Sequence, residues 1–370
     1  INSNMKTTFI VCLFSSVVMI RAQEKNSEIH TELLLFLNNY LSMKNSIIIL
    51  CLFTSTFLCA QQTPQYSQYQ RNQFMVNPAA AGVYDFIDIT LSGRWQWLGV
   101  QDAPRTSYFA FSVPVRFKQK FYNPGIRTSS GVVENPEIKT GKLKHTFGGQ
   151  LLADQYGAFR KFSFSGTYAV HIPMTKKVNL SFGVKAGLSN NTFFADQAQV
   201  LNILAPGQNP YNDDAYDNFI QNQSNKFLMD MGAGLYMYSE KFFFGLSAEQ
   251  LTRDLVQFGQ GTANFNPQIH FNLIGGYRIP MGENLSITPG FLIKYMGPAP
   301  PSIDGTVQFE YKKWLWLTLG YRHTDAMIVM SGMNISERFK VGYSYDYSLS
   351  RFNNFSSGGH ELTLGLILGR

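Results

Sequence analysis

Two short polar groups contain the residue types that a hydrolase uses. His323 and Asp325 flank a threonine, and the pair His360-Glu361 follows closely behind two serines. A hydrolase needs a nucleophile, a base and an orienting acid that converge within hydrogen-bond reach. The chain lacks the G-x-S-x-G sequence that holds a nucleophilic serine on a strained turn. We therefore expect these residues to be ordinary polar side chains, at strand ends and in the lumen of the β-barrel predicted below. Of the three hypotheses for function that follow, a membrane-embedded hydrolase is the weakest.

Acidic and amide side chains also crowd one region in a way that suggests a calcium site. These residues are Asn212, Asp213, Asp214 and Asp217. Oxygen atoms at this density could hold calcium, but their spacing matches no complete calcium-binding loop. All three cysteines lie within the first sixty residues, which leaves the rest of the chain without thiol ligands. The sequence therefore predicts a solvated acidic loop, no metal and no other cofactor.

Composition indicates that the elements that position these residues are membrane-spanning strands. Aromatic and charged residues each make up 15% of the chain, whereas ordinary soluble domains contain about 25% charged residues. After residue 60 there is no long uninterrupted apolar segment, which excludes spanning helices. The net charge of +7 comes from scattered basic residues, which does not favour nucleic-acid binding. Many aromatic residues with few charges are typical of a barrel that faces lipid outward and is polar within.

Alternation of apolar and polar residues predicts the strands themselves. In residues 161–171 one face is aromatic and apolar, and in residues 361–370 leucine recurs at every second position. Segments with this pattern lie at residues 86–92, 106–113, 145–153, 161–170, 178–186, 228–238, 241–249, 269–278, 285–294, 305–312, 315–321, 326–333, 339–345 and 361–369. Because their number is even, the first and last strands can pair antiparallel and leave no open edge. We predict an all-β fold, a transmembrane antiparallel up-and-down β-barrel of about 14 strands.

The lengths of the connections give an independent test of this fold. With both termini in the periplasm, short turns should alternate with long extracellular loops. Tight turns are expected at residues 173–177, 239–240, 280–284, 313–314 and 336–338, and long loops at 187–227, 251–267, 295–304 and 346–360. Residues 114–144 depart from the pattern, since a long segment falls where a short turn is expected. We interpret it as a periplasmic insertion or as a hairpin that the strand count misses.

The N-terminal residues contain export signals. Residues 43–60 combine a cationic start, an apolar run and a small final residue, which is the pattern of a secretory signal peptide. We expect cleavage after Ala60 rather than lipidation of Cys59, because the large Leu58 precedes that cysteine. Residues 1–42 contain a second signal-like segment, which we interpret as a start-site artefact.

The remaining chain divides into a polar segment and the barrel. Residues 61–85 are rich in Gln, Asn and Tyr and are too polar for a membrane strand. They would either plug the lumen or stay on the periplasmic side. Residues 86–370 would form the outer-membrane barrel.

Several short sequences, in order along the chain, resemble a known family. They are Pro64–Gly82, Ala103–Thr106, Asp154–Gly157, Leu180–Gly187, Trp316–Ala326, Val341–Tyr347 and Ser357–Leu362. Together they resemble the PorP/SprF family of Bacteroidetes outer-membrane proteins over essentially the whole chain after residue 60. The resemblance implies a multi-pass outer-membrane component of the type IX secretion system and its linked gliding machinery, which assists export or surface display of adhesins and of proteins with C-terminal sorting domains. Implied partners are outer-membrane lipid, periplasmic and outer-membrane components of that system, and secreted adhesin-type cargo.

A second, shorter resemblance supports an alternative function. Asn77-Pro78-Ala79 resembles the asparagine-proline-alanine element of FadL-type transporters of hydrophobic compounds, although it also reads as a turn in which proline fixes φ. Charges expected to face inward are Lys185, Lys294, Lys340 and Asp346. They could set the selectivity of a pore, but lumen charges of both signs more often pair and fill a barrel. A FadL-like transporter or porin for small hydrophobic molecules is therefore the second hypothesis.

Two groups of residues are candidates for partner contacts. The basic residues of the insertion could contact a periplasmic partner, and tryptophans near the first extracellular loop could contact partners outside. These candidates are Lys118, Lys120, Arg127, Lys139, Lys142, Lys144, Trp95 and Trp97. The alternatives are a solvated loop near anionic headgroups and an interfacial aromatic belt without a recognition role.

Of the three hypotheses for function, we rank the non-enzymatic export component first.

Overall fold

The chain divides into two compact units, Ile1–Ala60 and Gln61–Arg370. The computed structural model describes residues 64–115, 138, 140–194, 226–252, 256–258, 263–265, 268–297 and 299–369, all within the second unit. Within these ranges, no helix is long and apolar enough to cross a membrane.

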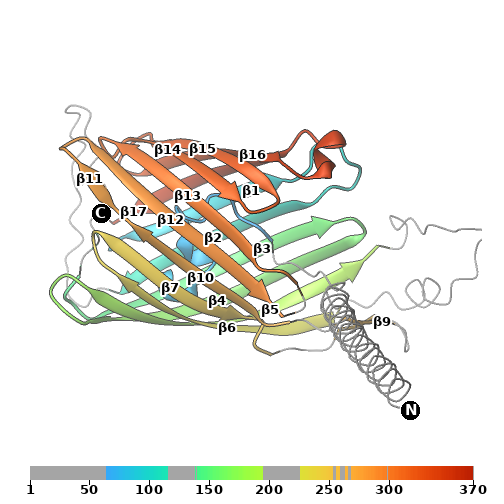
Figure 1. Cartoon of the computed structure of the whole chain (residues 1–370). Helices are drawn as coiled ribbons and strands as arrows, with labels where there is room; N and C mark the ends of the chain where they lie inside the picture. The colour runs from blue at the N-terminus through green and yellow to red at the C-terminus, as the bar shows by residue number, and fades with distance from the viewer. Residues whose placement is uncertain are drawn as a thin grey trace, which may run out of the picture. The chain divides into compact units, whose positions relative to one another are not determined.

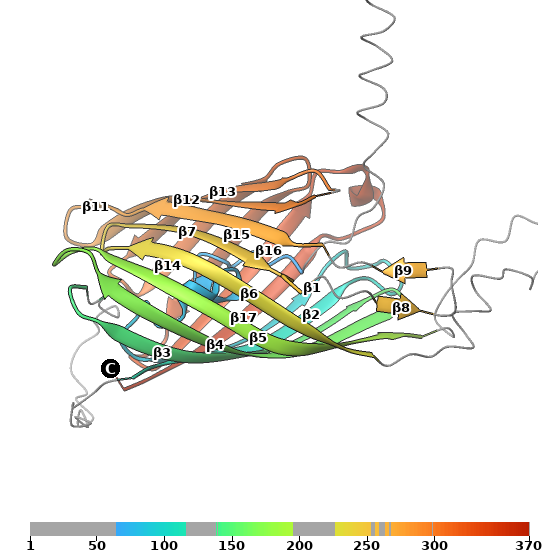
Figure 2. The same cartoon turned by 90° about the horizontal axis from the view of Figure 1, so that it is seen from below.

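Fourteen antiparallel strands form one closed barrel (Figures 1 and 2). In chain order the elements are β1 (Ile87–Trp95), β2 (Arg105–Val115), β3 (Lys144–Tyr156), β4 (Phe159–Pro173), β5 (Asn179–Phe193), β6 (Lys226–Tyr238), β7 (Phe242–Glu249), β10 (His270–Tyr277), β11 (Ile279–Met281), β12 (Leu285–Met296), β13 (Ser302–Tyr311), β14 (Leu315–Arg322), β15 (Ala326–Asn334), β16 (Phe339–Ser348) and β17 (Gly359–Leu368). The short β11 continues β10 beyond Arg278, and both pair with β12, so the two count as one strand. The predicted barrel of about 14 strands is confirmed.

Pairing of the first and last strands closes the barrel. Ile87 of β1 lies opposite Leu368 of β17, and the ladder continues to Trp95 opposite His360. On the other side of the ring, β10 pairs with both β7 and β12. A separate two-stranded hairpin, β8 (Val256–Phe258) with β9 (Ala263–Phe265), lies in the connection between β7 and β10. The backbone groups of the barrel strands are therefore paired all the way round, as a lipid environment requires.

Alternation along each strand separates an apolar outer face from a polar lumen. In β17, Leu362 and Leu364 are 42% and 48% exposed, whereas Glu361 and Thr363, which alternate with them, are buried. Successive side chains of a strand point to opposite faces, so the exposed leucines form the outer surface. An outer surface of this kind suits contact with lipid.

The two ends of the barrel differ in their connections. At one end, which we call the turn end, tight turns join β4 to β5, β6 to β7, β13 to β14 and β15 to β16. The C-terminal end of β17 lies at the same end, on the left in Figure 1. At the opposite end, the loop end, β5 and β6 are joined through residues 194–225 and β7 and β10 through residues 250–269.

Two details differ from the sequence prediction. The connections Gly157–Ala158 and His323–Asp325 are tight turns at the loop end, where long loops are expected. The neighbouring strands β3, β4 and β5 extend further toward the loop end than predicted, because polar residues such as Gln155 and Arg160 continue the pairing. Most of the 114–144 connection, residues 116–137 and 139, lies outside the described residues.

Candidate functional site: the plugged lumen and its turn-end vestibule

The segment Pro64–Phe86, which we call the plug, lies inside the barrel. At its start, the Pro64 carbonyl accepts a hydrogen bond from Lys294 Nζ in the loop-end part of β12. Near its finish, the Val83 carbonyl accepts one from Lys144 Nζ at the turn end of β3, at 3.2 Å. The plug therefore runs through the lumen from the loop half to the turn end, where β1 begins.

Apolar side chains of the plug form a core with inward residues of the wall. The plug contributes Tyr66, Tyr69, Phe74, Met75 and Val76, and the wall contributes Tyr108, Ala169, Tyr236, Ile274 and Leu292. All of these side chains are buried. A barrel whose lumen was lined only by polar groups would stay hydrated, so the plug converts its middle into a packed interior.

The Asn77-Pro78-Ala79 sequence anchors the plug to the wall. Asn77 Nδ2 donates to the backbone carbonyls of Leu235 and Leu246 at 2.9 and 3.3 Å. Asn77 Oδ1 accepts from the Ala79 amide at 2.9 Å, which caps the short 3-10 turn at Pro78–Ala80. The Asn77 side chain thus forms hydrogen bonds with the plug backbone and with two backbone carbonyls of the barrel at once.

Three glycines leave the space that this anchor fills. They are Gly183 of β5, Gly234 of β6 and Gly245 of β7. A Cβ atom at Gly183 would overlap Ala79, and one at Gly245 would lie 2.7 Å from Asn77 Nδ2. We call the space at these three glycines the notch. The notch and the Asn77-Pro78-Ala79 sequence are therefore complementary in shape.

A buried ion cluster holds the plug near the loop end. Arg94 donates to Asp346 at 2.7 Å and to Glu361 at 3.2 Å. Ser67 of the plug joins it, since its amide donates to Glu361 at 2.8 Å and its hydroxyl contacts Asp346 and Arg94. Arg322 completes the cluster through Asp346 and Asp304, at 3.3 and 3.1 Å. We call Arg94, Asp304, Arg322, Asp346 and Glu361 the loop-end charge cluster.

Other inward charges pair in the same way. Lys185 lies 3.2 Å from Glu249, and Lys340 lies 2.7 Å from Asp88. Together with Asp346, these residues confirm the expectation that charges of both signs face the lumen and pair there. Lys294 also faces inward and is engaged by the plug.

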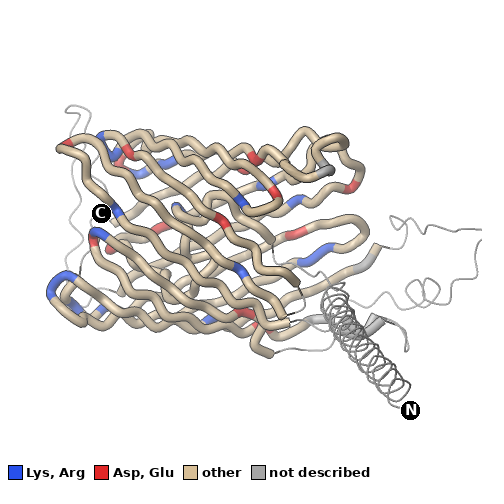
Figure 3. Tube along the Cα trace, viewed as in Figure 1, with Lys and Arg blue, Asp and Glu red and all other residues tan. Residues whose placement is uncertain are grey.

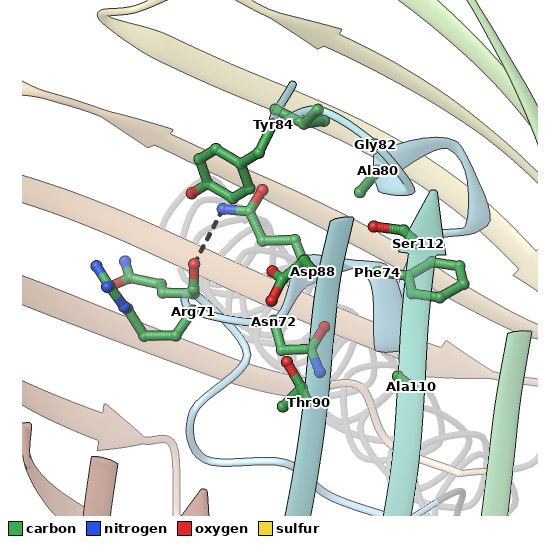
Figure 4. Close-up of a pocket in the computed structure, with 13 residues that line it drawn as sticks. Arg71, Asn72, Phe74, Ala80, Gly82, Tyr84, Asp88, Thr90, Ala110 and Ser112 are labelled. Atoms are coloured by element: carbon green, nitrogen blue, oxygen red, sulfur yellow. Dashed lines mark hydrogen bonds between the residues drawn. The ribbon is translucent and has the colours of Figure 1, made fainter. Parts of the chain in front are cut away.

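A cavity of about 490 Å³ opens beside the plug at the turn end. We call it the vestibule. Plug residues Gln70, Arg71, Gln73 and Tyr84 form one side of it, and wall residues from β6 round to β17 form the rest. A pocket of about 30 Å³ continues from it between the plug and the first two strands, bounded by Arg71, Asn72, Phe74 and Asp88 (Figure 4).

Two arginines share one carboxylate in the vestibule. Glu310 accepts from Arg71 at 3.3 Å and from Arg278 at 2.8 Å, one guanidinium on each oxygen. Arg71 also lies over the Trp316 ring at 5.4 Å. The Gln70 side chain is 9% exposed, and neither its amide nitrogen nor its amide oxygen has a hydrogen-bond partner within the described residues. The vestibule therefore offers guanidinium groups that the protein itself uses only in part, beside a buried Gln70 amide that has no partner within the described residues.

The residues considered for hydrolysis are not brought together. His360 lies on the outer face, where its ring nitrogen contacts the Tyr343 hydroxyl at 2.6 Å, whereas Glu361 points into the lumen. His323 and Asp325 lie in the exposed turn between β14 and β15, and Asp325 pairs with Arg322. Across the described part of the chain, no group of three or more His, Cys, Asp or Glu residues could hold a metal ion. Residues 212–217 lie outside the described residues.

The partner-contact candidates are separated in space. Lys142 is exposed at the turn end, whereas Lys144 is buried and faces the Val83 carbonyl and the Tyr238 ring. Trp95 lies at the loop end of the outer face, 41% exposed, and Trp97 lies in the loop that follows, half-buried with a φ of 51°. The remaining candidates, Lys118, Lys120, Arg127 and Lys139, lie outside the described residues.

Sequence reasoning missed the arginines of the lumen. Arg94 and Arg322 occupy inward positions of alternating strands, so the same period that identified Lys340 could have identified them. Gln70 and Arg71 carry no such signal, because the plug has no strand period. Arg278 interrupts the strand between β10 and β11, and its place at the vestibule follows only from the closed barrel.

Comparison with known proteins gives one strong match. The family described as type IX secretion system membrane protein PorP/SprF matches residues 58–366. No curated protein matches the chain.

Solved outer-membrane barrels resemble the chain only distantly. Omp33 of Acinetobacter baumannii is 7% identical, covers 77% of this chain and 97% of its own, and gives a TM-score of 0.38. The toluene transporter TbuX of Ralstonia pickettii is 10% identical, with 80% and 91% covered and a TM-score of 0.42. The monoaromatic hydrocarbon channel CymD is 9% identical, with 80% and 91% covered and a TM-score of 0.44.

Proposed function

The chain belongs to the PorP/SprF family of type IX secretion system membrane proteins, and we propose that this outer-membrane, multi-pass barrel assists export or surface display of adhesins and of proteins with C-terminal sorting domains, without catalysing a reaction. Membership makes it a membrane component of the secretion system. The assisting role, the cargo and a link to gliding are the proposal.

The observation that supports a helper rather than a conduit is the occupied lumen. The plug carries a packed core of large side chains, including Tyr69 and Phe74, across the interior. It is fixed by Asn77 at the wall and by Ser67 at the loop-end charge cluster. A folded protein could not pass through a lumen filled in this way. The barrel would therefore act through its two mouths and its outer surface.

We propose that the turn end faces the periplasm. Both ends of the barrel-forming chain, near Ile87 and Leu368, lie there together with most short turns, as in other outer-membrane barrels. Figure 3 shows Lys and Arg at several of these turns, and Lys142, Lys176 and Lys177 are exposed there. In this orientation Lys142 and the basic insertion residues 118–139 would contact periplasmic machinery. Trp95 and Trp97 would face the cell surface.

The test is surface display in cells that lack the protein. Deletion should remove specific adhesins or sorting-domain proteins from the surface, and re-expression should restore them. A tag in a loop-end connection should co-purify periplasmic secretion components from detergent-solubilised outer membranes. Lys142→Glu should lower that recovery, whereas Lys142→Arg, which keeps the charge, should not.

The transporter alternative predicts the opposite result in these experiments. Unchanged surface display together with ion conductance or hydrocarbon uptake by the purified barrel would reject the export role. It would support transport of a small hydrophobic molecule instead.

A further inference from the structure

The vestibule has the size of a ligand site. Its volume of about 490 Å³ lies within the range of about 300–1,000 Å³ that is usual for binding pockets. It opens at the turn end, and the plug closes it from within. A ligand would therefore enter from the turn side and contact both the plug and the barrel wall.

The charge of the vestibule favours an anion. Among the described residues that line it, five cations face three carboxylates. The cations are Arg71, Lys241, Arg278, Lys313 and Lys340. The carboxylates are Glu240, Glu283 and Glu310, and the nearby Asp88 is engaged by Lys340. The excess is positive even when that fourth carboxylate is counted.

The two guanidiniums supply directed donors as well as charge. Each guanidinium carries five N–H groups in a planar fork that matches a carboxylate. Arg71 and Arg278 each give Glu310 one hydrogen bond, and their side chains are 23% and 35% exposed. Most of their donors are therefore open to a second carboxylate that enters the vestibule.

Gln70 adds a group suited to a peptide backbone. A side-chain amide has one acceptor and two donors, which complement the N–H and C=O of a peptide bond. The Gln70 amide makes no hydrogen bond within the described residues, so it can turn toward a ligand without losing one. A buried amide without partners is costly, and a ligand that paired with it would relieve that cost.

We propose that the vestibule is a receptor site for an acidic, extended peptide segment of a soluble protein on the turn side. A side-chain carboxylate of the peptide lies between Arg71 and Arg278, and its backbone pairs with Gln70. This inference rests on the proposed export role, because that role provides a soluble partner at this mouth of the barrel. The export role does not specify the chemistry of this contact, which we infer to be recognition of a carboxylate and a peptide backbone.

The test uses the purified full-length barrel in detergent and two capped probe peptides, Gly-Glu-Gly-Glu-Gly and Gly-Gln-Gly-Gln-Gly. Saturation-transfer NMR titrations measure the affinity of each. The glutamate peptide should bind about tenfold more tightly, which is the worth of one charge-assisted hydrogen bond. Arg278→Gln should abolish this preference. Arg105→Gln, at an exposed arginine of the loop end, should leave it intact.

A second variant separates backbone recognition from charge. Gln70→Ala should weaken both peptides by a similar factor and keep the preference for glutamate. Equal affinity for the two peptides, or an equal loss in Arg278→Gln and Arg105→Gln, would overturn the proposal. So would competition by glycerol phosphate as strong as that of the glutamate peptide, because it would identify a lipid-headgroup site. The failure of this assay leaves surface display in cells untouched, so the two proposals fail separately.

Discussion

Asn77 of the plug occupies the space that Gly234 of the barrel wall leaves empty. A Cβ atom on Gly234 would overlap Asn77 Oδ1, while Asn77 Nδ2 donates to the carbonyl of the neighbouring Leu235. The same asparagine reaches Leu246 on the adjacent strand. Plug and wall therefore depend on one another at this position in the lumen.

Gly234→Ala tests this dependence. The added methyl group must displace Asn77 or the strand, and overpacking of this kind costs roughly 1–3 kcal/mol. The free energy of unfolding should fall by that amount in urea titrations of the barrel in lipid vesicles. Gly305→Ala is the matched control, because a Cβ there meets no atom within 4 Å. Equal effects of the two substitutions would show that the notch does not hold the plug.

Arg94→Met tests the loop-end charge cluster. Without Arg94, Glu361 loses the cation that lies 3.2 Å away, whereas Asp346 keeps Arg322. An unpaired buried carboxylate costs about 3–5 kcal/mol, so the same urea titration should show a loss of that size. Glu361→Gln in the Arg94→Met background should recover part of it. Arg105→Met, at an exposed arginine, should change stability by no more than about 0.5 kcal/mol.

The alternation of apolar and polar residues in the sequence predicted the strands wherever successive side chains face lipid and lumen in turn. It predicted fourteen strands and the inward direction of Lys340 and Asp346, because a period of two is a property of the strand itself. It stopped short of Gln155 and Arg160, where strands extend past the apolar belt and both faces become polar. In these extensions successive side chains still point to opposite faces, but apolar and polar residues no longer alternate.

The vestibule could not be predicted in this way. Gln70 and Arg71 precede the first strand, and their positions depend on where the plug crosses the closed ring. Glu310 and Arg278 are far apart in sequence and meet Arg71 only because β13 and β10 both reach the turn end. The sequence of the plug contained one usable signal, Asn77-Pro78-Ala79, whose role as an anchor needed the three facing glycines to become visible.

Substitution of His323 or His360 should leave export unchanged. His360 contacts Tyr343 on the outer face while Glu361 points inward, and His323 lies in a turn. In a hydrolase, His323→Ala or His360→Ala would abolish activity and its downstream effect. We expect normal surface display of cargo in cells that carry either variant, measured by labelling of intact cells. Loss of display with normal barrel abundance would return the hydrolase hypothesis.

Removal of residues 64–80 should convert the closed barrel into a pore. These residues supply Tyr69, Phe74 and Met75 to the packed interior and the Asn77 anchor, whereas the paired strands that close the ring all follow them. In planar lipid bilayers the intact protein should conduct ions poorly, and the shortened protein should give discrete, larger conductance steps. Resistance of the unheated barrel to denaturation in detergent electrophoresis provides the control for folding. Asn77→Ala is a milder test, because it loosens the plug without shortening the chain and should give brief openings of the same size. An intact protein that already conducts as strongly as the shortened one would mean that the plug leaves an open path, and the transporter alternative would then take precedence.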